Sequence, residues 1–351
     1  MKRPALLKGM GLVISLIIWA TSCSLLGLDV APISLFKKPN TFPEPTYNFS
    51  KNPLTPETVE LGRSLFYDGL LSRDGTISCG ECHNQSHAFT HHGHVFSHGI
   101  DDRIGNRNAQ ALMNLAWQSS FFWDGGVFDL DMFSIAPIEN HNEMDESLSN
   151  VLKKVQATPR YQVLFKKAYG TEDVTSERFL KALSQFMLTL VSANSKYDQM
   201  LAGKVTFTAD EQAGLRLFTE KGCASCHPAP LFTDGTFRSN GLLPEYTSDL
   251  GRFRITENPS DKNKFKVPSL RNVEMTAPYM HDGRYLNLSM AVSHYSDLVE
   301  DTGTLDEVLK SKDQLGIPMT STEKQQITAF LKTLTDTEFL QNPRFSEFYK
   351  P

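Results

Sequence analysis

An all-α fold is predicted for this 351-residue chain, because its regular segments show helical periodicity and few of them alternate between apolar and polar residues as strands do. One helix is expected after residues 175–178, Thr-Ser-Glu-Arg, which can cap it. Another is expected after residues 320–323, Thr-Ser-Thr-Glu, which form a capping box. The apolar stripes of these two helices are Phe179, Leu183, Phe186 and Leu190, and Ile327, Phe330, Leu331 and Leu334.

A weak internal repeat divides the chain into two halves. Gly62-Arg63-Ser64-Leu65-Phe66 in the first half corresponds to Gly214-Leu215-Arg216-Leu217-Phe218 in the second. A Cys-x-x-Cys-His motif follows each segment, and an aromatic-threonine step, Phe89-Thr90 or Phe232-Thr233, follows each motif. The repeat predicts two domains of the same plan, residues 51–205 and 206–351, with a boundary near residues 203–208.

The first 50 residues are interpreted as an export signal and a tether. Basic residues precede an apolar run at residues 10–20 that is too short to span a bilayer. Small residues then lead to Cys23, as in a bacterial lipoprotein box, so residues 1–23 are a predicted signal and Cys23 a predicted lipidation site. An ordinary cleaved signal is the alternative. Residues 24–50 are the expected tether, and the folded part is expected in the periplasm, lipid-anchored to the outer membrane.

The cysteines carry the most information. Of the five, Cys23 belongs to the export signal, and none of the other four is left over for a structural disulfide. They form the motifs Cys79-x-x-Cys82-His83 and Cys223-x-x-Cys226-His227. Two thiols one helical turn apart can add to both vinyl groups of a haem, and the adjacent histidine then faces the iron. A zinc site would need further soft ligands, and a redox-active cysteine pair leaves both histidines unexplained, so two covalently bound c-type haems are predicted.

The sixth ligand of the second iron has several candidates: Met280, His281, Met290, His294 and Tyr295. Residues 287–299 are expected to form a helix capped by Asn287, with one apolar face made of Leu288, Val292, Tyr295 and Val299. Because the apolar face turns inward, Tyr295 is preferred to His294 as the ligand. A plain core tyrosine is the alternative.

Further segments, in this order, resemble the bacterial di-haem cytochrome c peroxidases and their MauG-like relatives over residues 54–335. They are Arg107-Asn108-Ala109, Phe122-Trp123-Asp124-Gly125, Pro137-Ile138-Glu139-Asn140 with Glu143-Met144, residues 267–273 (VPSLRNV) and residues 277–283 (APYMHDG). The resemblance implies two cytochrome c-like haem domains packed around an inter-domain interface. It also implies that the N-terminal haem is peroxidatic and that the C-terminal haem transfers electrons.

Individual roles are implied by the same resemblance. Glu143 matches the distal glutamate, Pro137 a proline six residues before it, and Trp123 the tryptophan between the haems. Tyr295 takes the position that is Met in the peroxidases and Tyr in MauG-like members. A calcium ion is implied between the domains, bound by Asn108 and the backbone carbonyls of Thr276 and Pro278.

Two positions depart from the family pattern. Phe133 stands where the family often has Gln, so one distal hydrogen bond is expected to be missing. Gly126 stands where Arg commonly follows Trp-Asp-Gly.

The predicted activity is reduction of hydrogen peroxide to water with electrons from a small soluble cytochrome or copper protein, with Glu143 moving a proton between the peroxide oxygens. A MauG-like oxidase that modifies a partner protein and a plain electron-transfer cytochrome are the alternatives. Glu143 and Pro137 count against the last. The net charge of −5 and the pI near 6.1 argue against nucleic acid as a partner, and a homodimer is left open.

A histidine-rich run follows the first motif: His87, His91, His92, His94 and His98. It could supply a gating ligand to the first haem, but an exposed, solvated run is the preferred interpretation. Met275, Met280 and Met290 are interpreted as packing residues.

Overall fold

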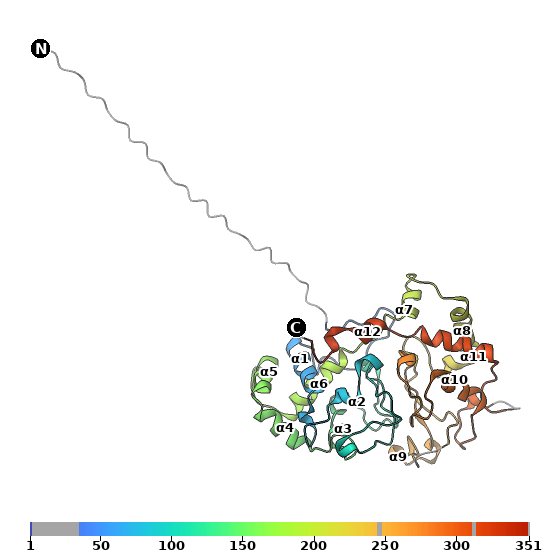
Figure 1. Cartoon of the computed structure of the whole chain (residues 1–351), viewed down its shortest axis with the longest axis horizontal. Helices are drawn as coiled ribbons and strands as arrows, with labels where there is room; N and C mark the ends of the chain where they lie inside the picture. The colour runs from blue at the N-terminus through green and yellow to red at the C-terminus, as the bar shows by residue number, and fades with distance from the viewer. Residues whose placement is uncertain (2–34, 244–247, 311–313, 350–351) are drawn as a thin grey trace. The chain divides into compact units, whose positions relative to one another are not determined.

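Helices make up nearly all the regular structure of the chain in the computed structural model, which describes Met1 and residues 35–243, 248–310 and 314–349 (Figure 1). The α-helices are α1 Pro56–Phe66, α2 Cys79–Cys82, α3 Ile135–Glu139, α4 Leu148–Ala157, α5 Pro159–Tyr169, α6 Ser176–Leu188, α7 Lys196–Leu201, α8 Ala209–Glu220, α9 Phe253–Thr256, α10 Leu288–Asp297, α11 Ser321–Lys332 and α12 Thr337–Gln341. Short 3₁₀ helices are η1 Gly69–Leu71, η2 Gln85–His87, η3 Ile100–Asp102, η4 Leu115–Trp117, η5 Leu130–Met132, η6 Cys223–Ser225, η7 Pro259–Asp261, η8 Val273–Met275, η9 Glu307–Leu309 and η10 Pro343–Phe345.

The predicted helical class is confirmed. Within the described ranges the one sheet pairs β1 Phe237–Arg238 with β2 Phe265–Lys266, two antiparallel strands of two residues each. No helix in the described part of the chain is both long and apolar enough to cross a membrane.

The predicted caps of α6 and α11 are confirmed. The Thr175 hydroxyl accepts a hydrogen bond from the Arg178 amide at 3.3 Å. In α11, Thr320 and Glu323 each accept from the other's backbone amide, at 3.2 and 2.8 Å, which completes the capping box. The apolar stripes of both helices are buried in the core, so periodicity and capping together located these elements.

Two helix pairs depend on the glycines of the sequence repeat. In the first half α1 packs on α6, and in the second half α8 packs on α11. A Cβ atom on Gly62 would lie 1.9 Å from the Ala182 carbonyl oxygen, and one on Gly214 would lie 1.9 Å from the Gln326 carbonyl oxygen. Because no side chain fits at such a distance, each glycine lets its helix approach the partner's backbone.

The apolar core forms two main clusters. One is built chiefly from residues 36–193 and the other from residues 197–334. The end of the chain returns to the first cluster, since Phe339 of α12 and Phe345 of η10 are buried there. Residues 35–351 form one unit by their contacts, and the domain limits given above remain predictions.

The predicted tether is partly wrong. Residues 2–34, which include Cys23, lie outside the described residues. In the described remainder, Phe42 is buried against the first cluster, and the Trp117 indole donates to the Pro43 carbonyl at 2.8 Å. The aromatic side chains of this stretch bury apolar surface, so residues 36–50 belong to the folded unit.

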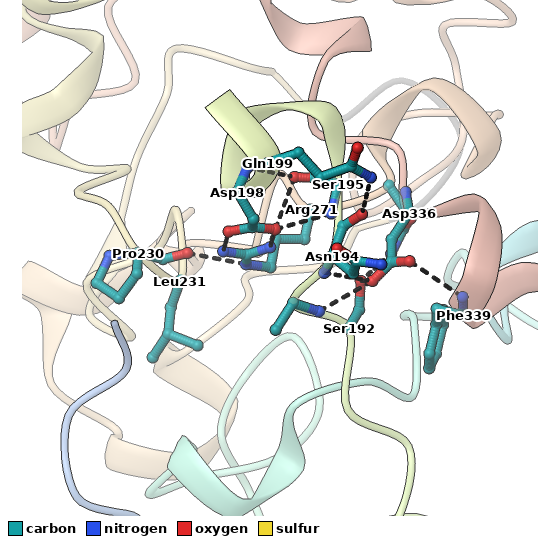
Figure 2. Close-up of polar contacts among 12 residues, drawn as sticks. Ser192, Asn194, Ser195, Asp198, Gln199, Pro230, Leu231, Arg271, Asp336 and Phe339 are labelled. Atoms are coloured by element: carbon teal, nitrogen blue, oxygen red, sulfur yellow. Dashed lines mark hydrogen bonds and ion pairs between the residues drawn. The ribbon is translucent and has the colours of Figure 1, made fainter. Parts of the chain in front are cut away.

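A buried carboxylate joins the segment before α7 to the segment before α12 (Figure 2). Asp336 Oδ2 accepts hydrogen bonds from the Ser192 hydroxyl at 3.1 Å and from the amides of Ala193 and Asn194 at 2.9 Å each. Asp336 Oδ1 accepts from the Phe339 amide at 3.0 Å and so caps α12. The carboxylate therefore ties the end of the chain to the connection between the halves.

A buried ion pair lies beside this carboxylate. The Arg271 guanidinium is fully buried and donates to both Asp198 oxygens, at 2.8 and 2.9 Å, and to the Pro230 carbonyl at 2.8 Å (Figure 2). It also lies over the Phe42 ring, 4.7 Å from the ring centre. The arginine of the VPSLRNV segment thus holds α7 against the loop that follows the second motif.

Replacing Asp336 should destabilise the fold strongly. Asp336→Ala would leave several buried donors without an acceptor, at a cost of about 3 kcal/mol, which corresponds to a fall in Tm of roughly 5–10 °C. Thermal unfolding of the haem-loaded protein, followed by circular dichroism, measures this change. Gln341→Ala on the same helix is the control, because Gln341 is exposed and should change Tm by no more than about 2 °C. Equal losses in the two variants would contradict the assigned role.

Candidate haem sites and the cavity between them

The first motif lies at a helix end that orients its histidine. Cys79 and Cys82 bound the single turn of α2, and His83 follows as its C-cap. His83 Nδ1 forms a hydrogen bond of 2.7 Å with the Phe89 carbonyl oxygen. Because the carbonyl only accepts, Nδ1 carries the proton, and Nε2 keeps a lone pair that can bind a metal.

The second motif repeats this arrangement. Cys223 begins the short helix η6, Cys226 is its C-cap, and His227 Nδ1 bonds the Phe232 carbonyl at 3.0 Å. Burial lowers the pKa of His227, as it lowers that of His83 to about 4, so both rings stay neutral. All four motif cysteines are free of disulfides. Thiols and oriented, neutral histidines at both motifs fit covalently bound haems.

A cavity of about 550 Å³ adjoins the second motif. Its walls come from both halves of the sequence and bring together most of the predicted site residues: Asn108, Trp123, Cys223, Cys226, His227, Thr276, Pro278 and Tyr295. The lining does not include the first motif or Glu143, which lie elsewhere in the described structure. The space suits a large, mainly apolar group.

Tyr295 faces this cavity from α10. Burial raises the pKa of its phenol to about 12, although a hydrogen bond with the Asn240 side chain offsets part of the rise. The phenol lines the same cavity as Cys223 and Cys226 of the second motif. His294 is also buried, contrary to the expectation that its helix face points outward. Its Nδ1 bonds the Tyr285 hydroxyl at 3.1 Å, and its Nε2 donates to the Asn240 carbonyl at 2.9 Å. Both ring nitrogens of His294 are therefore engaged.

The other candidates for the sixth ligand differ in exposure. Met290 is 42% exposed, so it is neither a packing residue nor directed at a buried iron. Met280 lines the cavity, and its sulfur accepts a hydrogen bond from the side-chain amide of Asn240 at 3.5 Å. His281 also lines the cavity, but its ring stacks on Phe265 at 3.6 Å between centroids. Met280 packs in the second apolar cluster and Met275 in the first, as predicted.

Trp123 lies between segments of the two halves. Its indole donates to the Asn108 carbonyl at 2.8 Å, and its own carbonyl accepts from the Lys266 amide on β2 at 2.7 Å. The turn that follows is held by Arg107, which pairs with Asp124 at 2.6 Å and with Asp249 of the second half at 2.6 Å. The tryptophan is thus fixed at the cavity wall by backbone bonds on both sides.

The two departures from the family pattern have structural counterparts. The guanidinium of Arg252 donates to the carbonyls of Asp124 and Gly125, at 2.7 and 3.0 Å, so an arginine distant in sequence contacts the turn that Gly126 ends. Phe133 stacks on Phe122 with 4.8 Å between ring centres. An apolar ring pair therefore stands where the family often has a glutamine.

Sequence reasoning missed Lys266, a buried lysine in the cavity wall. Its ammonium group donates to Gln118 Oε1 at 2.7 Å and to the Ser120 carbonyl at 2.9 Å. Burial lowers its pKa to about 7, and the nearby Asp124 carboxylate offsets only part of that effect. The one sequence feature that could have indicated a buried lysine is its position between two apolar residues, Phe265 and Val267.

Glu143 lies beside the first motif on a turn after α3. Burial is the main cause that raises the pKa of Cys79 to about 12 and of Cys82 to about 11, and the Glu143 carboxylate adds to both shifts. Its backbone amide donates to the Asn140 carbonyl at 3.0 Å, and its carbonyl accepts from Ile100 at 2.8 Å. The Pro137 carbonyl accepts from the next amide, that of Met144, at 3.2 Å. The turn therefore holds a half-buried carboxyl near the first motif.

Comparisons with known proteins agree with this geometry. The sequence profile for "Di-haem cytochrome c peroxidase" matches residues 56–206. "Methylamine utilization protein MauG" of Methylorubrum extorquens is 35% identical over 308 residues, which cover 85% of this chain and 83% of that protein. "Cytochrome c551 peroxidase" of Nitrosomonas europaea is 37% identical over 289 residues, covering 80% and 82%. A crystal structure of a MauG-like protein associated with microbial copper homeostasis is 31% identical with a TM-score of 0.81, covering 90% and 99%.

The chain is therefore an oxidoreductase of the peroxidase type. It belongs to the di-haem cytochrome c peroxidase family, which includes MauG, and the resemblance seen in its sequence is confirmed.

Replacing Tyr295 should change the midpoint potential of the second haem. If Tyr295 is the sixth ligand and loses its proton to the second iron, Tyr295→Met would exchange an oxygen ligand for a thioether that favours reduced iron, and the midpoint potential of that haem should rise on the order of 0.1 V or more. Spectroelectrochemical titration of the purified protein measures this shift. His294→Gln serves as the control and should leave the second haem's spectrum in place. The reverse pattern would assign the ligand to His294.

Proposed function

We propose that this chain carries one haem on Cys79, Cys82 and His83 and another on Cys223, Cys226 and His227, and that it reduces hydrogen peroxide to water. The electrons would come from a small soluble cytochrome or copper protein. The observation that supports peroxide chemistry is the half-buried Glu143 carboxyl beside the first motif. A cytochrome that only transfers electrons has no need for such a group.

The reaction consumes two electrons and two protons for each peroxide and yields two waters. The first haem, held by Cys79, Cys82 and His83, would supply the redox chemistry of its iron. Glu143 would take the proton from one peroxide oxygen and deliver it to the other, so that water rather than hydroxide leaves. The backbone bonds of this turn, from Ile100 to Glu143 and from Met144 to Pro137, would keep the carboxyl in place for this transfer.

The second half serves electron delivery in this proposal. Tyr295 and His227, which line the same cavity, would both hold the second haem iron, and Trp123 connects the cavity to the first half. Calcium is assigned to Asn108 and the carbonyls of Thr276 and Pro278, supported by their common place in the cavity wall. The proposal also includes two domains, residues 51–205 and 206–351. It places the protein in the periplasm, attached to the membrane through Cys23.

A second candidate function is MauG-like oxidation of a partner protein. It is favoured by the placement of Tyr295 beside the second motif, because an anionic oxygen ligand stabilises high oxidation states of iron. The 35% identity to MauG over most of both chains supports the same alternative. Peroxidase is preferred because it requires no dedicated protein substrate.

A turnover assay tests the proposed function. The purified protein, given peroxide and a reduced cytochrome c, should oxidise the cytochrome, and Glu143→Gln should lower the rate by about a hundredfold or more. Glu139→Gln is the matched control, since Glu139 is an exposed carboxylate on α3 and should leave the rate unchanged. A spectral response to peroxide without turnover would instead favour oxidation of a partner protein, and no response would leave only electron transfer.

The pH dependence provides a test of Glu143 as the proton acceptor. Burial raises its pKa above the usual 4.5, while the hydrogen bond from Asn140 at 2.6 Å lowers it. The accepting carboxylate is lost as pH falls through this pKa, so kcat/KM should decline on the acid side above pH 4.5. Asn140→Ala removes the donor and should move that decline to higher pH. An unshifted decline would assign it to another group.

A further inference from the structure

The imidazole rings of the histidine-rich run lie in contact with one another. The His87 and His92 rings stack with centroids 3.8 Å apart. The His94 ring lies 5.7 Å from that of His91 and 4.8 Å from that of His98. Five imidazoles thus gather in one loop, and imidazole is a preferred ligand of zinc, copper and nickel.

Two ring nitrogens of this loop already have the spacing of metal ligands. His94 Nδ1 lies 3.1 Å from His98 Nε2. Two nitrogens bound to one ion at about 2.0–2.1 Å lie about 2.9 Å apart at a right angle and about 3.3 Å apart at the tetrahedral angle. The observed separation, that of a hydrogen bond between the two rings, falls between these values, so a cation that replaces the shared proton can bind both atoms once the rings turn toward it.

A carboxylate orients one member of the pair. His98 Nδ1 donates to Asp102 Oδ1 at 2.5 Å, which leaves the lone pair on Nε2, the atom directed at His94. A carboxylate behind a histidine is the usual partner of a metal-bound imidazole, because it fixes the tautomer and raises the basicity of the ligand. His98 therefore has the tautomer that a cation requires. His94 Nδ1, which donates to His98 Nε2, must release its proton before it can bind the same ion.

His91 supplies a third nitrogen nearby. Its Nε2 is buried and has no hydrogen-bond partner in the structure, a costly condition for a polar atom. Within the described residues no three histidine, cysteine or carboxylate side chains already surround one point. A cation bound by His94 and His98 would thus take water as further ligands, or His91 after a side-chain rotation.

The loop also contacts the turn that carries Glu143. Gly99 follows His98 directly, and a Cβ atom on it would lie 2.2 Å from the Asn142 carbonyl and 2.5 Å from that of Glu143. The next amide, that of Ile100, donates to the Glu143 carbonyl at 2.8 Å. The histidine pair is therefore anchored at one end to a tightly packed backbone, which limits how far His98 can move.

We propose that His94 and His98 form a binding site for one divalent transition-metal cation of the zinc and copper class, separate from both haem irons. Asp102 orients His98 from behind, and His91 is the nearest further ligand.

Zinc titration of the haem-loaded protein, by calorimetry, tests this site. The unaltered protein should bind one Zn²⁺ at the loop, and a variant carrying both His94→Gln and His98→Gln should lose that binding. Asp102→Asn should weaken it about tenfold, since it removes only the orienting carboxylate. His92→Gln is the matched control in the same loop, because His92 stacks on His87 outside the pair, and it should bind Zn²⁺ as the unaltered protein does.

Two outcomes would overturn the proposal: zinc binding that persists in the double variant, or equal loss in the His92→Gln control. The absorption spectrum of the first haem, recorded for every variant, shows whether the loop and the motif beside it remain folded. Because binding is measured without peroxide, the result does not depend on whether the protein is a peroxidase.

Discussion

The bond between each motif histidine and a phenylalanine carbonyl is the constraint on which both haem sites depend. Phe89 and Phe232 accept from the histidines at 2.7 and 3.0 Å, and both have left-handed backbones, with φ of 59° and 53°. That conformation costs an L-residue roughly 1–2 kcal/mol. Each ring is almost fully buried, so apolar burial offsets the cost. A single residue thus turns its carbonyl toward the histidine and anchors the turn in the core.

The repeated glycines place these turns at equivalent positions in the two halves. Gly62 and Gly214 let α1 and α8 cross a partner helix at backbone contact, and each motif lies downstream of its helix. A larger residue would push the helix outward and move the motif away from its carbonyl acceptor. The weak sequence repeat is therefore explained by the close helix packing that both halves require, although their other residues differ.

Local signals predicted the elements whose causes are local. Capping residues located α6 and α11, and the Cys-x-x-Cys-His spacing located both motifs. The missed features arise from contacts between distant residues. Arg252 reaches Gly125 across 127 positions, and Lys266 reaches Gln118 across 148. The burial of His294 likewise depends on Asn240, 54 residues away, which no helical periodicity reveals.

The asymmetry between the two sites follows from what surrounds each motif. Glu143 lies close enough to the first motif to add to the raised pKa of both Cys79 and Cys82, and it is the carboxyl proposed to move a proton there. The second motif faces Tyr295 and a cavity. The wall of this cavity includes Lys266, whose pKa is lowered to about 7 by burial. A positive group in a low-dielectric wall stabilises added negative charge, such as an arriving electron. Under the proposed function, the residues outside the repeat would assign proton transfer to the first motif and electron supply to the second, because these residues differ between the halves.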